Sequence, residues 1–162
     1  MTGHHVRDAA EADIPELVRL RGILFEGLAG TWGAVPPGGG WRQACADALR
    51  AALADDSVRV LVTGAGTGLA CCGAGTVDRR LPSPFNPGGA IGHVFGIVTD
   101  PACRGQGHAR AVTQALLGWF DQRGIGRVDL NASPDGQHLY QSLGFTPHPD
   151  RTLSRTRPRP PR

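Results

Sequence analysis

The chain has 162 residues and contains no lysine, so all 17 of its basic residues are arginines. A nucleoside-triphosphate P-loop ends in Gly-Lys-Ser or Gly-Lys-Thr, and the absence of lysine excludes that kind of site. No apolar run approaches the length that crosses a bilayer, and the N-terminus lacks the pattern of a signal peptide. We therefore expect a cytoplasmic protein with no membrane partner.

The four cysteines form no C-x-x-C pair, so their spacing does not favour a metal site. Cys71 and Cys72 are adjacent in a stretch expected to be a strand, where neighbouring side chains point to opposite faces. We predict buried, reduced thiols and no bound metal.

Positive charge is concentrated at one end of the chain. Residues 151–162 carry five arginines and no acidic residue, whereas the rest of the chain holds 12 basic and 14 acidic groups. The body is therefore slightly acidic and shows no basic face of the kind that recognises nucleic acids. We expect no nucleic-acid partner; an arginine tail that bound one would give steep salt dependence that disappears with residues 151–162.

The pattern of apolar residues, glycine and proline predicts one domain in which strands and helices alternate. Strands are expected at 4–8, 57–63, 69–79, 90–99 and 127–132, with two more from Phe145 onward, the second over 151–156. Helices are expected from Asp13 with a break at Gly22, from Trp41 to Leu53, after Gly107, and between Ser133 and Gly144. Residues 26–40 are expected to form a long loop and residues 64–68 a hairpin turn.

The most informative segment runs from Val98 to Arg110, where an apolar strand, a proline-containing turn and a glycine-rich loop lead into a helix. The start of a helix presents unpaired backbone N–H groups and the positive end of the helix dipole, which together bind phosphate or pyrophosphate. Gly105 and Gly107 let the backbone approach such an anion closely. A dinucleotide fingerprint fits poorly, because Arg110 stands where the third glycine of G-x-G-x-x-G would be.

The loop from Arg104 to Ala109 resembles the Arg/Gln-x-x-Gly-x-Gly/Ala loop of the GNAT-type N-acetyltransferases, which holds the pyrophosphate of acetyl-CoA. The preceding IVTDPACRGQG and the later DLNASPDGQHLYQSLGF, with its LYxxLGF ending, are also similar to that family. The N-terminal segment VRDAAEADIPELVRLR is similar to the first strand and helix of that family. The resemblance spans nearly the whole chain and is weakest between about residues 26 and 60.

This resemblance implies an α/β fold: a mixed, mostly antiparallel central sheet with splayed parallel central strands, flanked by about four helices. Residues 1–150 would form the acetyltransferase domain, and residues 151–162 the last strand and an Arg/Pro-rich tail. The implied activity is transfer of acetyl from acetyl-CoA to a primary amine by direct attack in a ternary complex. The alternative is a non-catalytic acyl-CoA-binding or regulatory module of the same fold. A homodimer is compatible with either.

The resemblance also assigns roles to residues. Backbone groups of Gly96, Ile97 and Val98 would bind pantetheine and polarise the acetyl carbonyl. A glycine in mid-strand supports a bulge there. The alternative is that this glycine only relieves crowding between neighbouring residues. The pyrophosphate cradle would consist of Arg104, Gly105, Gln106, Gly107, His108, Ala109 and Arg110, mostly through backbone N–H groups.

Tyr140, the only tyrosine, occupies the family position often assigned as the general acid. A phenol has a pKa near 10, close to that of an alkyl thiol, so proton donation to the departing thiolate is nearly matched. The alternative is an aromatic side chain that packs against a strand. Asp129 is the candidate base, with Glu26, His93 and a water relay as further candidates.

The acceptor is expected to be a small-molecule or peptide amine. We predict that residues 26–40 are the main acceptor-recognition element and order on substrate binding, because their prolines and glycines cannot join a helix or a sheet ladder. Phe25, Trp32 and Trp41 would wall an apolar amine, or alternatively belong to the core. A plain surface connection is the other interpretation of this loop.

Overall fold

The computed structural model describes residues 3–65 and 68–157, so two residues of the expected hairpin turn, Gly66 and Thr67, and the last five residues of the tail lie outside the described residues. The chain divides into two compact units, Met1–Asn131 and Ala132–Arg162. Each unit is described by itself below.

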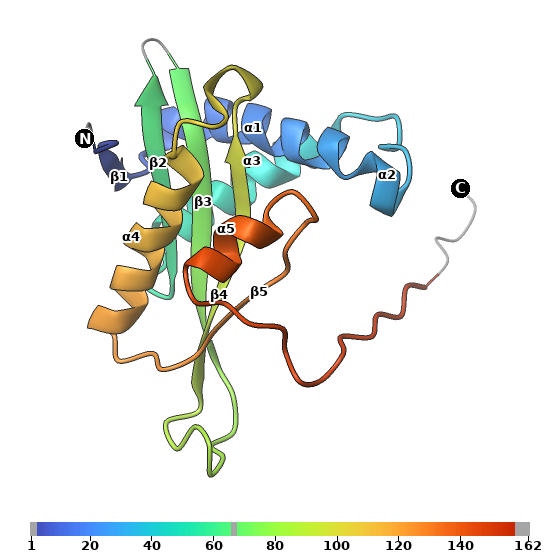
Figure 1. Cartoon of the computed structure of the whole chain (residues 1–162). Helices are drawn as coiled ribbons and strands as arrows, with labels where there is room; N and C mark the ends of the chain where they lie inside the picture. Colours follow the sequence, from blue (N-terminus) through green and yellow to red (C-terminus); the bar gives the residue numbers. More distant parts are fainter. Residues whose placement is uncertain (1–2, 66–67, 158–162) are drawn as a thin grey trace. The chain divides into compact units, whose positions relative to one another are not determined.

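In the first unit, five strands form one sheet in the order β1-β2-β3-β4-β5 (Figure 1). The pairs from β1 to β4 are antiparallel, and β4 and β5 are parallel. The mixed, mostly antiparallel sheet expected from the sequence is therefore confirmed. The strands are β1 (Val6–Asp8), β2 (Val58–Ala65), β3 (Gly68–Arg79), β4 (Ala90–Thr99) and β5 (Val128–Leu130).

Helices cover both faces of this sheet. Helix α4 packs on one face, and α1 and α3 lie on the other (Figure 1). In the described residues the α-helices are α1 (Ile14–Gly27), α2 (Ala29–Trp32), α3 (Gly40–Leu53), α4 (His108–Gln122) and α5 (Gln137–Ser142). Helix α5 belongs to the second unit.

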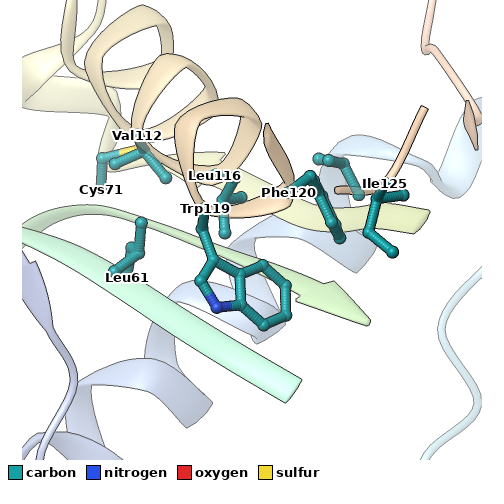
Figure 2. Close-up of a cluster of buried hydrophobic side chains, with 8 residues drawn as sticks. Leu61, Cys71, Val112, Leu116, Trp119, Phe120 and Ile125 are labelled. Carbon is teal, nitrogen blue, oxygen red and sulfur yellow. The ribbon is translucent and has the colours of Figure 1, made fainter. Parts of the chain in front are cut away.

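The core under α4 follows from the spacing of its apolar residues. Val112, Leu116 and Phe120 are fully buried against the sheet, and Trp119 is almost so (Figure 2). Glycine residues in the strands leave room for the large rings, because a Cβ on Gly92 would lie only 2.8 Å from the Phe120 ring. Truncation of a fully buried phenylalanine costs about 3–5 kcal/mol, so this cluster contributes strongly to the stability of the fold.

Side chains of β2 and β3 alternate between the two faces, as the pleat of a strand requires. Leu61 and Cys71 join the α4 cluster, whereas Val62 and Cys72 join the cluster under α1, which also contains Leu20. The prediction that the adjacent cysteines point to opposite faces is confirmed. Both thiols are buried and free, while the free thiols of the two remaining cysteines are half-buried.

The expected break at Gly22 and the expected loop over residues 26–40 are both corrected. Helix α1 continues through Gly22, which is buried close to Trp41 and Arg42 of α3, so packing against α3 supports the helix there. It then runs to Gly27, and α2 forms before the irregular backbone of residues 33–39.

The second unit differs from expectation at both of its ends. Ser133 forms a turn with Gly136, so α5 begins only at Gln137. No strand is present over the described residues 145–157, and the expected last strands are wrong there. Pro147 and Pro149 lack the N–H groups that a sheet ladder needs.

Candidate functional site

Strands β4 and β5 pair over only three positions. The pairs are Gly92 with Val128, His93 with Asp129 and Val94 with Leu130, where β5 ends. Strand β4 continues to Thr99, so within the described residues its second half has no partner strand on the β5 side. Backbone groups along that edge are open to an extended ligand that adds to the sheet as a strand would.

A β-bulge lies at the start of this unpaired stretch. Cys72 pairs with Val98 and Ala74 with Phe95, so the single residue between them on β3 faces two residues, Gly96 and Ile97, on β4. Gly96 has a φ of +64°, a left-handed conformation that favours glycine. The sequence-based prediction of a bulge at Gly96 is confirmed.

Crowding does not explain Gly96. A Cβ at this position would meet nothing closer than Nη1 of Arg21, at 3.6 Å, which is ordinary van der Waals contact. The backbone conformation is therefore the reason for glycine. Bulges re-aim backbone groups beside functional sites, and here the side chains of Ile97 and Val98 are directed into the two cores, under α4 and under α1 respectively.

The glycine-rich loop after β4 has the conformation expected of an anion cradle. Gly105 and Gly107 have φ values of +73° and +91°, and a Cβ on Gly105 would meet no atom within 4 Å. Gly107 is the N-cap of α4. In the part of the chain that the structure describes, the N–H groups of residues 105–109 have no hydrogen-bond partner. They are available to a pyrophosphate.

Side chains of this loop divide into exposed and buried. Arg104, Gln106 and Arg110 are exposed, and Arg104 Nε lies 3.4 Å from the Thr99 carbonyl oxygen. His108 is only 6 % exposed, so its ring is largely withdrawn from solvent, and Ala109 packs against the α4 cluster. The loop therefore offers charge from its two arginines and hydrogen bonds from its backbone.

Two distant segments hold this loop in place, and neither was predicted from the sequence. His4 Nε2 is hydrogen-bonded to the Gln106 carbonyl oxygen, and the His4 ring lies against the His108 ring with centroids 3.7 Å apart and an interplanar angle of 31°. On the other side, Arg19 of α1 forms an ion pair of 2.7 Å with Asp100. This contact holds the pKa of Asp100 below its ordinary range, and the carboxylate also accepts the N–H of Ala102.

The candidate bases lie in different surroundings. Asp129 is half-buried, and both of its oxygens accept hydrogen bonds of 2.9 and 3.0 Å from Arg127. His93, its register neighbour on β4, stacks on Phe95 with centroids 5.9 Å apart. Glu26 is exposed on α1. Asp129 and His93 are thus brought together, at the second of the three paired positions of β4 and β5.

Tyr140 lies on α5 in the second unit. It is half-buried, and its ring meets Phe145 edge-on with centroids 6.0 Å apart. Gly144, with a φ of +94°, ends the helix as predicted, and the Phe145 N–H returns to the Tyr140 carbonyl oxygen.

The aromatic residues near the expected acceptor loop separate into two groups. Phe25 and Trp41 pack edge to face with centroids 5.8 Å apart, and Phe25 remains 36 % exposed. Trp32 lies on α2 and is 81 % exposed. An open groove of about 400 Å³ between α1 and α3, lined in part by Val18 and Arg42, includes neither the glycine-rich loop nor the bulge.

Burial makes the two sheet thiols poor nucleophiles. Desolvation raises the pKa of Cys71 to about 11 and that of Cys72 to about 12. Both are protonated at neutral pH, although Cys72 Sγ lies 3.8 Å from the Gly96 carbonyl oxygen. Among the described residues no group of histidine, cysteine and carboxylate side chains is placed to hold a metal, and no helix is long and apolar enough to cross a membrane.

Comparison with known proteins places this geometry in context. Residues 30–145 match the model of the acetyltransferase (GNAT) family. The chain is 34% identical over 96 residues to glucosamine 6-phosphate N-acetyltransferase 1 of Oryza sativa subsp. japonica. This match covers 59% of this chain and 56% of that protein. The chain is also 29% identical over 136 residues to mycothiol acetyltransferase of Rhodococcus erythropolis. That match covers 82% of this chain and 43% of that protein. The matches thus span about half the length of these relatives.

Solved structures share the fold over nearly the whole chain. A predicted acetyltransferase with acetyl-CoA from Clostridium acetobutylicum superposes with a TM-score of 0.81 at 20% identity and covers 93% of this chain and 95% of that chain. A GCN5-related N-acetyltransferase from Ralstonia eutropha gives a TM-score of 0.76 at 25% identity, over 94% of this chain and 98% of that chain.

Proposed function

Since the chain belongs to the acetyltransferase (GNAT) family, we propose that it transfers the acetyl group of acetyl-CoA to a primary amine by direct attack in a ternary complex. One observation carries the proposal. The unpaired half of β4, which begins at the Gly96 bulge, leads directly into the open N–H groups of residues 105–109. A strand-like pantetheine and an attached pyrophosphate need these two features in this order.

In this proposal the bulge of β4 and the glycine-rich loop bind different parts of acetyl-CoA. Backbone groups of Gly96, Ile97 and Val98 hydrogen-bond the pantetheine, and a backbone N–H at the bulge donates to the acetyl carbonyl oxygen as negative charge develops on it. The N–H groups that follow Gly105 bind the pyrophosphate, and the exposed guanidinium groups of the loop add charge-assisted hydrogen bonds. Alignment of the thioester with the amine supplies the entropic part of catalysis.

The chemical step needs two proton transfers. The neutral amine attacks the thioester carbon, the C–S bond breaks, and the thiolate leaves with a proton from Tyr140. The nitrogen loses its proton to Asp129 or, because Arg127 already occupies that carboxylate, to a water molecule. The neutral thiol of Cys72 supports direct transfer over an acetyl-enzyme, because a thiol with a pKa of about 12 is a weak nucleophile at neutral pH.

The acceptor amine enters from the side of α1 in this proposal, with α2 and residues 33–39 as its recognition element. Relatives named for glucosamine 6-phosphate and mycothiol favour a small polar acceptor. Trp32 contributes exposed apolar area to this part of the surface.

The experiment is an acetyl-CoA-dependent thiol-release screen over protein N-termini, lysine peptides, aminoglycosides, polyamines and amino sugars, with the acetylated product identified by mass. Amine-dependent release of free CoA supports the proposal. Tight binding of acetyl-CoA without turnover across the whole panel would favour a non-catalytic acyl-CoA-binding module instead.

A further inference from the structure

Arg21 of α1 lies beside the bulge of β4. Its Nη1 is 3.6 Å from the position that a Cβ on Gly96 would occupy, and apart from Gly96 and its two chain neighbours no other described residue has an atom within 4 Å of that position. The side chain is half-buried, and its guanidinium carbon lies 5.0 Å from the centre of the Phe25 ring. A cation is therefore held against the point where the proposed function locates the reacting carbonyl.

In the part of the chain that the structure describes, this guanidinium has no carboxylate as a counter-charge. Throughout residues 3–65 and 68–157, no carboxylate forms an ion pair or hydrogen bond with Arg21. Arg19, two residues earlier on the same helix, pairs with both Glu16 and Asp100. A half-buried charge is costly unless it is matched, and the planar guanidinium fork suits a bidentate anion.

The described neighbours of Arg21, which are Phe25, Gly96 and Cys72, supply no negative charge. The nearby Cys72 thiol is protonated, because burial raises its pKa to about 12. Phe25 holds the guanidinium by a cation–π contact, and Trp41 packs edge to face with Phe25. The aromatic contact orients the cation without neutralising it.

We propose that Arg21 binds an anionic group, a phosphate or a carboxylate, on the acceptor amine, so that the enzyme selects amines that carry a negative charge near the reacting nitrogen. This inference rests on the proposed function, because the bulge at Gly96 marks the site of transfer. Arg21 then determines specificity, and the anion that it binds replaces the missing counter-charge.

The test compares kcat/KM for matched amines that differ in charge. Glucosamine 6-phosphate against glucosamine tests a phosphate, and 4-aminobutanoate against 4-aminobutanamide tests a carboxylate. The variants are Arg21→Gln, Arg21→Lys and the control Arg123→Gln. Arg123 also stacks on an aromatic ring, Trp119, at 5.2 Å and forms no ion pair among the described residues, but it lies at the end of α4 opposite the glycine-rich loop.

We expect the wild type to favour the anionic member of at least one pair by roughly 10- to 100-fold, the size of a charge-assisted hydrogen bond. Arg21→Gln should remove this preference by raising KM for the anionic amine, while the neutral amine is unaffected. Arg21→Lys should keep part of the preference, and Arg123→Gln all of it. The pair that responds identifies the anion.

Equal kcat/KM for charged and neutral amines in the wild type would overturn the inference and leave the proposed function standing. An equal fall of kcat for both amines in Arg21→Gln would also overturn it, because the guanidinium would then act on the transition state or on the fold. Absence of turnover on every amine would instead be a failure of the proposed function. Equilibrium binding of the four compounds to the CoA-saturated protein then decides: anion selectivity lost in Arg21→Gln supports the inference, and no selectivity overturns it.

Discussion

His108 Nδ1 lies 3.0 Å from the hydroxyl oxygen of Thr63, and both side chains are almost fully buried. His108 begins α4 directly after the glycine-rich loop, and its ring contacts the ring of His4 at a tilt. Burial lowers the pKa of His108, and the neighbouring imidazole of His4 lowers it further. The base of the loop is thus packed around a histidine that resists protonation.

This arrangement predicts that acid destabilises the fold through His108. In the unfolded chain His108 takes up a proton near its ordinary pKa of 6.5, whereas in the folded chain it does so only at lower pH. Between these two pH values the unfolded state binds more protons, so the free energy of unfolding falls as pH decreases below about 6.5. Urea unfolding at pH 7.5 and 5.5 measures this fall.

His108→Gln should show a smaller fall in stability over this pH range than the wild type. His5→Gln, at an exposed histidine, is the matched control and should keep the wild-type profile. A profile of His108→Gln that coincides with that of the wild type would show that the buried imidazole is not the source of the pH dependence.

Cys72→Ala tests whether the thiol beside the bulge takes part in the chemistry. Turnover should remain within about twofold of the wild type, with a loss of about 1 kcal/mol in the free energy of unfolding for the buried sulfur. Intact-mass measurement after incubation of the wild type with acetyl-CoA should show no acetylated protein. Loss of turnover in a folded Cys72→Ala, together with an acetylated wild type, would require an acetyl-enzyme.

Tyr140→Phe should lower kcat by about 100-fold or more and leave the affinity for acetyl-CoA nearly unchanged, because it removes one proton donor and no binding contact of the loop. Stopped-flow thiol release isolates the chemical step. If that step proceeds at the wild-type rate, Tyr140 is only a packing residue against Phe145.

Trp32→Ala tests the acceptor-recognition element. Since the side chain is 81 % exposed, the stability should change by no more than about 0.5 kcal/mol. We expect a raised acceptor KM and an unaltered Kd for acetyl-CoA. Phe85→Ala, at a fully exposed ring in the loop between β3 and β4, is the control. Wild-type kinetics in Trp32→Ala would make the segment a plain surface connection.

Features that depend on local pattern were predictable from the sequence. The apolar spacing of α4 is buried as its periodicity indicates, and the glycines at 96, 105 and 107 have the positive φ values for which glycine is suited. A strand, a glycine-rich loop and a helix in direct succession specify the local conformation of this loop without reference to distant residues.

Features that depend on distant contacts were not predictable. His4 reaches Gln106 across 102 positions, and Arg19 reaches Asp100 across 81, so no local periodicity indicates either contact. The continuation of α1 through Gly22 likewise depends on α3, because Trp41 and Arg42 pack there. Arg21 and Gly96 are also far apart in the sequence, and only the fold shows that they lie close together.

Titration of acetyl-CoA into the wild type and into Gly107→Glu tests most directly whether the glycine-rich loop is the donor site. The glutamate would force a side chain onto a φ of +91° and set a negative charge in the pyrophosphate cradle. Gly118→Ala, inside α4 with open space around it, is the control. Wild type and Gly118→Ala should bind with micromolar affinity and Gly107→Glu at least about 100-fold more weakly; equal affinity in Gly107→Glu would contradict the assignment of the loop.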